Sequence, residues 1–146
     1  MTDKQEDLIA APDALADALE DAVARPDRPL DSLLSELATL LLGFSRDSFQ
    51  RPRVHRMLGI VYGYLGRDSD AVKELHDARE LAKTVSPPNY RELGHVARAL
   101  SAMHAASGDE RLARDELMTA LTFTAVAGQP EEVVRLVEDV AQSELD

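Results

Sequence analysis

The sequence of 146 residues contains no cysteine and no tryptophan, and aromatic residues make up only 4% of it. Without cysteine, the chain has no disulfides, no thiol catalysis and no cysteine-ligated zinc. The scarcity of aromatic residues leaves β-strands with few of the residues that they prefer. No apolar run approaches the roughly 20 residues that cross a bilayer, and the polar, acidic start is unlike a secretory signal. We therefore expect a cytoplasmic protein with no membrane insertion.

Basic residues are outnumbered by acidic ones, with 16 of the former, 27 of the latter and a formal net charge of −11. This balance argues against nucleic-acid binding, which needs lysine and arginine against phosphate. The charges are unevenly distributed. Residues 1–50 carry four basic and eleven acidic side chains, residues 51–107 nine and six, and residues 108–146 three and ten. A basic centre therefore lies between two acidic ends.

Alanine and leucine, both strong helix formers, occur 21 times each. Glycine and proline divide the chain into segments whose apolar residues recur at helical spacing. No segment alternates with the period of two that is typical of strands. The pattern predicts an all-α fold in one domain over residues 1–146, with residues 1–10 flexible. The seven predicted helices cover residues 12–25, 30–43, 51–65, 68–85, 89–107, 109–127 and 130–144.

Local signals fix several of these helix ends. Pro12 suits the first turn of a helix, where its missing N–H costs nothing. Gly66 and Gly108 are natural helix terminators because glycine readily adopts the left-handed conformation. Asn89 with Glu92 three residues later is a capping-box signature, and Asp109 is a second predicted N-cap.

Two stretches of the chain match each other at a spacing of 42 residues, which is the distance from Gly66 to Gly108. Small residues and leucines recur at the same offsets on either side of these two glycines. The matched pairs are Leu58 and Leu100, Gly59 and Ser101, Ala71 and Ala113, Leu75 and Leu117, and Ala78 and Ala120.

The first stretch reads His55-x2-Leu58-Gly59-x2-Tyr62, then Ala71-x3-Leu75, then Ala78. It resembles the tetratricopeptide repeat, whose pattern is Trp-x2-Leu-Gly-x2-Tyr, then Ala-x3-Phe, then Ala. The 42-residue spacing exceeds the family period of 34 and is similar to long-helix variants. The resemblance implies antiparallel helix pairs stacked as a short right-handed solenoid. Residues 51–85 and 89–127 would be the recognisable repeats and residues 130–144 a C-terminal capping helix.

The same resemblance implies a non-enzymatic adaptor or regulator that binds a peptide or a partner protein. In the family, the first helix of each pair lines the binding groove. On that face we predict Arg53, Arg56, Ile60, Tyr64, Arg91, His95, Arg98 and Ala102. Because arginine binds carboxylates through a two-pronged hydrogen-bonded fork, the expected partner is acidic. The alternative is that these arginines pair internally with Glu74, Asp77 or Glu92.

Leucines occupy more than one side of the helix predicted over residues 30–43, which indicates burial on more than one side. One interpretation is a central core helix. The other is a surface that buries a hydrophobic client or a second copy of the chain. These surfaces correspond to two alternative functions, a small acidic secretion-type chaperone and a homo-oligomeric structural module with a possible homodimer. The residues concerned are Leu33, Leu37, Leu40, Leu41 and Phe44.

The sequence contains no Gly-x-Ser-x-Gly elbow, phosphate loop or dinucleotide fingerprint. His55 and His104 occupy packing positions of the repeat. His76 and Glu80 lie four residues apart, but two ligands without a third make a weak metal site, and a solvated helix face is the better interpretation. We therefore predict no enzymatic activity, no cofactor and no metal.

Overall fold

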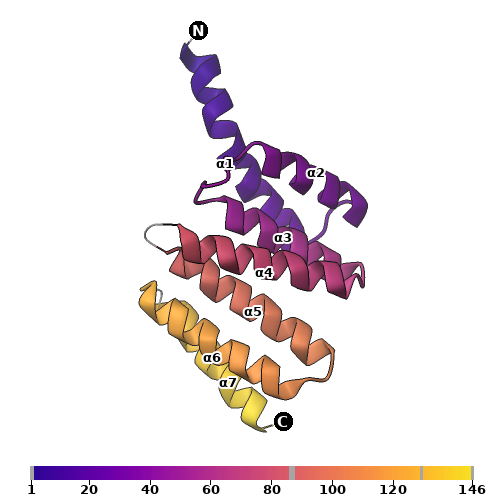
Figure 1. The fold of residues 1–146 in the computed structure, drawn as a ribbon, viewed down its shortest axis with the longest axis vertical. Helices are drawn as coiled ribbons and strands as arrows, with labels where there is room; N and C mark the ends of the chain where they lie inside the picture. Colours follow the sequence, from indigo (N-terminus) through magenta and orange to yellow (C-terminus); the bar gives the residue numbers. More distant parts are fainter. Residues whose placement is uncertain (1, 86–87, 129, 146) are drawn as a thin grey trace.

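The computed structural model describes residues 2–85, 88–128 and 130–145, with side chains for residues 12–85, 88–128 and 130–143. Every regular element in this part of the chain is an α-helix, which confirms the all-α prediction (Figure 1). The elements are α1 (Thr2–Ala24), α2 (Leu30–Leu42), α3 (Arg51–Tyr64), α4 (Asp68–Thr84), α5 (Tyr90–Ala106), α6 (Glu110–Val126) and α7 (Pro130–Leu145).

The helix bounds lie within one or two residues of the predicted ones except at the N-terminus. There α1 begins at Thr2, so Pro12 lies inside the helix and its predicted place in the first turn is wrong. A proline inside a helix removes one backbone hydrogen bond, but the alanines and leucines around it favour the helix. The side chains of residues 1–11 lie outside the described part, and the flexibility of residues 1–10 stays a prediction.

Glycines end α3 and α5 in the same way. Gly66 and Gly108 have φ of 74° and 83°, the left-handed conformation that residues with a side chain rarely adopt. After α3, the Arg67 N–H donates to the Tyr62 carbonyl at 2.9 Å, and after α5 the Asp109 N–H donates to the His104 carbonyl at 2.9 Å. These bonds define Schellman motifs, which satisfy carbonyls that the helix leaves unpaired.

The two predicted N-caps are present. The Asn89 side chain accepts a hydrogen bond from the Glu92 N–H at 3.2 Å, and Asp109 accepts one from the Leu112 N–H at 3.1 Å. The reciprocal half of the predicted capping box is absent, because the Glu92 carboxylate bonds to Arg56 of α3. A charged partner on a neighbouring helix has replaced the backbone N–H that a capping box would use.

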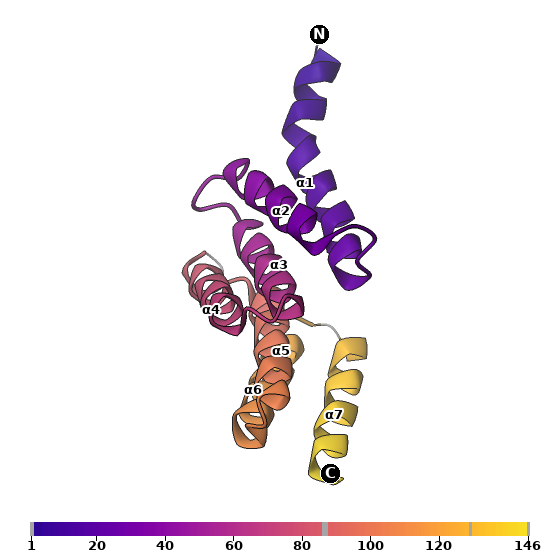
Figure 2. The same ribbon diagram turned by 90° about the vertical axis from the view of Figure 1, so that its right-hand side faces the viewer.

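Each helix contacts the next one in the chain, and α3 also contacts both α1 and α5. The two termini consequently lie at opposite ends of the molecule (Figure 1). Turned by 90°, the structure shows α1 and α7 on the side of α3 and α5 opposite α4 (Figure 2). The odd-numbered helices α1, α3, α5 and α7 therefore share one side of the molecule.

The largest group of buried apolar residues lies among α1, α2 and α3. Leu33 and Leu37 are fully buried in it, Leu40 is buried, and Leu41 and Phe44 are partly buried against it. Of the two interpretations of the leucine-rich helix α2, the structure supports the one in which it is part of the core. The alternative, a client or oligomer surface made of these side chains, is wrong for the buried Leu33, Leu37 and Leu40, because α1 and α3 already cover them.

The 42-residue repeat is visible in the contacts of the two helix pairs. Gly59 lies so close to α4 that a Cβ atom there would be 3.1 Å from the Ala71 carbonyl oxygen. At the matching position Ser101 is buried and donates a hydrogen bond from its hydroxyl to the Ala113 carbonyl at 2.7 Å. In each pair a small residue of the first helix thus lies against the equivalent carbonyl of the second helix. Gly59 does so by close packing and Ser101 by a hydrogen bond.

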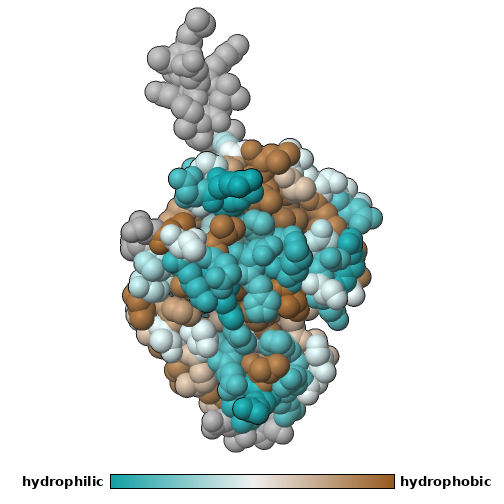
Figure 3. All heavy atoms as spheres, in the orientation of Figure 1, coloured by the Kyte–Doolittle hydropathy of each residue, from teal (hydrophilic) through white to brown (hydrophobic). Residues whose placement is uncertain are grey.

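Among the residues that the structure describes, no helix combines the length and the apolar character needed to cross a membrane. The face seen in Figure 1 carries many hydrophilic residues, with hydrophobic ones scattered between them (Figure 3).

Candidate binding pocket

A pocket of about 610 Å³ lies between α3 and α5. Its size falls within the range of about 300–1,000 Å³ that is usual for ligand sites. The α3 helix contributes one wall, α5 the other, and the start of α4 closes one end. The lining residues are Arg56, Gly59, Ile60, Gly63, Tyr64, Asp68, Leu75, His95, Arg98, Ala99, Ala102, Met103, Ala106 and Ser107.

The two walls come from matching positions of the repeat. Arg56, Ile60 and Tyr64 of α3 lie 42 residues before Arg98, Ala102 and Ala106 of α5. Residues spaced by four on a helix share one face, so the same face of two equivalent helices is turned into one pocket.

Six of the eight residues predicted for the groove line this pocket, namely Arg56, Ile60, Tyr64, His95, Arg98 and Ala102. The other two, Arg53 and Arg91, line a second hollow of about 380 Å³ that shares His95 with the first. The structure therefore brings all eight residues to two hollows that share one lining residue, His95.

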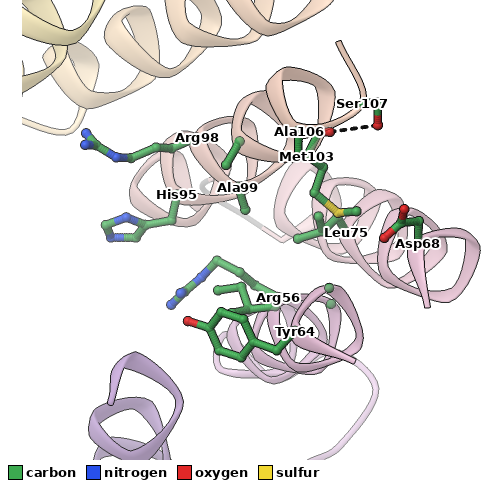
Figure 4. Close-up of a pocket in the computed structure, with 14 residues that line it drawn as sticks. Arg56, Tyr64, Asp68, Leu75, His95, Arg98, Ala99, Met103, Ala106 and Ser107 are labelled. Carbon is green, nitrogen blue, oxygen red and sulfur yellow. Dashed lines mark hydrogen bonds between the residues drawn. The ribbon is translucent and has the colours of Figure 1, made fainter. Parts of the chain in front are cut away.

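The interior of the pocket is more apolar than the prediction implied. Eight of its lining residues are glycine or carry apolar side chains: Gly59, Ile60, Gly63, Leu75, Ala99, Ala102, Met103 and Ala106. Arg56 and Tyr64 lie on α3 opposite His95 and Arg98 on α5, and Asp68 lies toward the other end of the pocket (Figure 4). The Tyr64 side chain is half exposed. The pocket thus has a cationic end, an apolar middle and an acidic end.

Arg56, at the cationic end, is buried and paired with two carboxylates. Its guanidinium donates to Glu92 of α5 at 2.8 and 3.1 Å and to Glu20 of α1 at 2.6 Å. Burial alone would lower the pKa of Arg56, but the charges and hydrogen bonds of Glu92 and Glu20 raise it above its ordinary value. Arg56 therefore stays charged and joins α1, α3 and α5.

Glu20 also receives Arg53, so one carboxylate of α1 holds two arginines of α3. Asp17, one turn earlier in α1, pairs with Arg53 at 2.8 Å. Burial would raise the pKa of Glu20, but the hydrogen bonds and charges of Arg56 and Arg53 outweigh it and hold that pKa below its ordinary value. Arg53 and Arg56 of α3 are therefore both paired with carboxylates of the same chain.

Arg98 is in a different situation from Arg56. It donates to Asp139 of α7 at 2.6 Å, and the two side chains are 47% and 43% exposed. Ion pairs exposed to this extent contribute about 0–1 kcal/mol. Of the two arginines that line the pocket, Arg98 is the one that a ligand carboxylate can recruit at little cost.

His95 lines both hollows. Burial lowers its pKa, and Arg56 and Arg91 act in the same direction, while the charges of Glu92 and Glu132 act against them. Arg91 donates to the His95 Nε2 at 3.4 Å, which requires that nitrogen to be unprotonated. His95 is therefore neutral at neutral pH.

The predicted alternative of internal pairing is correct for Glu92 and wrong for Glu74 and Asp77. Glu74 contacts His55, and Asp77 contacts Lys73. The partners that sequence reasoning missed are Asp17, Glu20 and Asp139, which lie in the acidic ends of the chain. The sequence did contain a signal for these pairs, namely the acidic ends on either side of the basic centre. In the structure the acidic α1 and α7 flank the arginines of α3 and α5.

No family model, no curated protein and no solved structure matches this chain. The pocket, its repeated walls and its ion pairs are therefore the features that indicate a function.

Proposed function

We propose that this chain is a non-enzymatic, tetratricopeptide-like adaptor that binds a segment of a partner protein in the pocket between α3 and α5. In this proposal the helix pairs form a short right-handed solenoid, α7 is its cap, and α1, α3, α5 and α7 line the concave side. The contacts of each helix with its chain neighbours, and of α3 with α1 and α5, support this arrangement.

The observation that carries the proposal is that matching faces of two equivalent helices line one pocket. Packing alone explains why Gly59 and Ser101 face a neighbouring carbonyl. It does not explain a hollow of about 610 Å³ with a half-exposed tyrosine beside it. Aromatic side chains that combine an apolar ring with a polar tip are enriched at protein interfaces, where a partner covers the ring.

The chemistry of the pocket selects a ligand that is more apolar than the sequence suggested. Ile60, Ala102 and Met103 offer surface to an apolar side chain. Arg56 is already paired with two carboxylates, whereas Arg98 pairs with the half-exposed Asp139. The ligand we propose is a peptide segment with an apolar residue in the middle and one carboxylate that replaces Asp139 at Arg98.

The apolar middle also favours the second candidate function, a small acidic chaperone that shields an apolar client segment. The two functions use the same pocket and differ in what the partner does without this protein. A chaperone client aggregates or is degraded when the protein is missing, and an adaptor's partner remains folded.

Ala102 and Ala105 provide a matched test of the site. Both are exposed on α5 three residues apart, and only Ala102 lines the pocket. Peptides selected on the full chain from a displayed random library would be titrated against Ala102→Trp and Ala105→Trp. We expect Ala102→Trp to weaken binding by about tenfold or more, which is about 1.4 kcal/mol, and Ala105→Trp to leave it unchanged. Equal affinities for the two variants would place the binding site elsewhere.

Arg98 and Asp139 test the charge of the ligand. Arg98→Ala should weaken a selected peptide that contains a carboxylate, and Asp139→Asn should strengthen it because Arg98 then has no internal competitor. Both effects should shrink as salt rises, since exposed charges are screened over about 8–10 Å at physiological ionic strength. Opposite signs for the two variants support the proposed recognition, and unchanged affinity in both contradicts it.

A further inference from the structure

His55, Glu74 and Asp77 gather on a side of α3 that the pocket does not use. His55 belongs to α3, and the two acids lie three residues apart on α4. One ligand atom from each residue lies within 4.8 Å of the other two, and His55 Nδ1 is 2.7 Å from a Glu74 carboxylate oxygen. An imidazole and two carboxylates are thus placed together by the antiparallel packing of two helices.

The cluster is held in place by its surroundings. The side chains of His55 and Glu74 are only 14% and 17% exposed. One turn along α3, Gly59 brings the two helices together, with Leu75 and the Ala71 carbonyl against it. Because ligands on rigid helices lose little freedom when they bind an ion, this geometry favours coordination.

The basic side chains near the cluster do not prevent a cation from binding there. Lys73 is 3.7 Å from Asp77, but these side chains are 71% and 47% exposed, so that contact is weak. Arg51 and Arg46 line a hollow beside His55 and Asp77 and oppose a cation there. The Arg51 guanidinium donates to the carbonyls of Phe44 and Leu41 and is thereby held by the end of α2. Glu80 lines the same hollow and adds a negative charge.

We propose that His55, Glu74 and Asp77 bind a divalent transition-metal ion of the zinc class, with water completing the coordination. Zinc accepts histidine nitrogen and carboxylate oxygen at about 2.0–2.2 Å, so its ligand atoms lie at most about 4 Å apart. The three ligand atoms lie within 4.8 Å of one another, so small side-chain movements bring them to such positions. A mixed nitrogen and oxygen donor set suits zinc, cobalt or manganese better than calcium or magnesium, which prefer oxygen alone.

Such an ion would tie α3 to α4 without entering the pocket. This inference does not depend on the proposed peptide binding, because the pocket is lined by the α3 face that carries Arg56, Ile60 and Tyr64. The consequence for the molecule is that the first wall of the pocket would be fixed more firmly when the ion is bound.

The experiment uses the full chain after removal of metals with a chelator. We expect calorimetric titration with Zn²⁺ to show one ion bound per chain, and Zn²⁺ to raise the melting temperature of the protein. Co²⁺ should give visible absorption bands at the same stoichiometry.

Two variants test the ligands. Asp77→Asn leaves the His55–Glu74 contact in place, and circular dichroism would confirm its fold. It should weaken Zn²⁺ by about tenfold or more, as should His55→Gln. His76→Gln is the matched control, since His76 is an exposed histidine next to Asp77 on α4. It belongs to the pair His76 and Glu80, for which the sequence analysis favoured a solvated helix face. Wild-type affinity in His76→Gln supports the site. No saturable binding, equal affinity in all variants, or loss of binding in His76→Gln would overturn it.

Discussion

Gly59 shows how one atom decides the distance between two helices. A Cβ atom at this position would lie 2.8 Å from Leu75 Cγ and 3.1 Å from both Leu75 Cδ2 and the Ala71 carbonyl oxygen. Real Cβ atoms essentially never come within 3.0 Å of another atom and seldom within 3.4 Å, and the backbone oxygen cannot move without moving α4. Gly63, one turn later on the same helix, has no atom within 4 Å of such a position.

This contrast gives a prediction for a single methyl group. Gly59→Ala should lower the free energy of unfolding by about 1–3 kcal/mol, because overpacking strains a close contact. Gly63→Ala should raise it by about 0.5–1 kcal/mol, since alanine favours the helix and meets no neighbour. Urea unfolding followed by circular dichroism measures both. A Gly59→Ala variant as stable as Gly63→Ala would show that α3 and α4 are not in this contact.

At the scale of a helix, α5 and α6 begin with the same kind of N-cap in different surroundings. Asn89 and Asp109 both cap a helix by accepting an N–H from the third residue of the first turn. Asn89 is buried and its amide also donates to the Phe49 carbonyl at 3.3 Å, which ties the start of α5 to the segment before α3. Asp109 is exposed and makes the capping bond alone.

We therefore expect the two caps to differ in their effect on stability. Asp109→Ala should cost about 1 kcal/mol, the usual value for a lost N-cap. Asn89→Ala should cost about 0.5–1.5 kcal/mol more, because it also removes the part-buried hydrogen bond to the Phe49 carbonyl. Thermal and urea unfolding of the two variants test this order. Equal losses would mean that water satisfies the Phe49 carbonyl as well as Asn89 does.

At the scale of the whole molecule, the charge pattern is an internal feature of the fold. The acidic ends of the chain form α1 and α7, and they supply Asp17, Glu20 and Asp139 to arginines of α3 and α5. The basic centre is thus largely neutralised before any partner arrives. The net charge of −11 favours electrostatic repulsion between copies of the chain.

Lowering the pH should reduce the stability of the folded chain in two steps, one from His95 and one from Glu20. The pKa of His95 is lowered by burial, so the folded chain favours the neutral ring. Its contribution to stability is complete above the ordinary value of about 6.5 and is lost as the pH falls through the lower folded value. The pKa of Glu20 is also below its ordinary value, since Arg56 and Arg53 outweigh its burial. Its contribution is complete above about pH 4.5 and is lost below that.

Urea unfolding at pH 7.5, 5.5 and 4 measures these steps. The wild type should lose stability in both intervals, and His95→Gln should lose less than the wild type between pH 7.5 and 5.5. Both proteins keep Glu20, so both should also lose stability between pH 5.5 and 4. Identical pH dependence of the two proteins in the upper interval would show that His95 titrates in the folded protein as it does in water.

The sequence alone determined the helices and the faces that meet at the pocket. Helix bounds depend on local chemistry, such as the φ of Gly66 and the side chain of Asp109, and local chemistry is written in neighbouring residues. The 42-residue spacing matched Arg56 with Arg98 and Ile60 with Ala102, and in the structure these four residues line one pocket. The position of α1 relative to Pro12 was missed because helix propensity around a proline competes with the proline itself.

Only the tertiary structure decided which charges meet. Glu20 lies 36 residues from Arg56, and Asp139 lies 41 residues from Arg98. No spacing rule predicts these pairs, because they depend on how helices from the two ends of the chain turn beside the centre. The same is true of His55, Glu74 and Asp77. Each residue is ordinary on its own helix, and only the packing of α3 against α4 brings an imidazole and two carboxylates within reach of one ion.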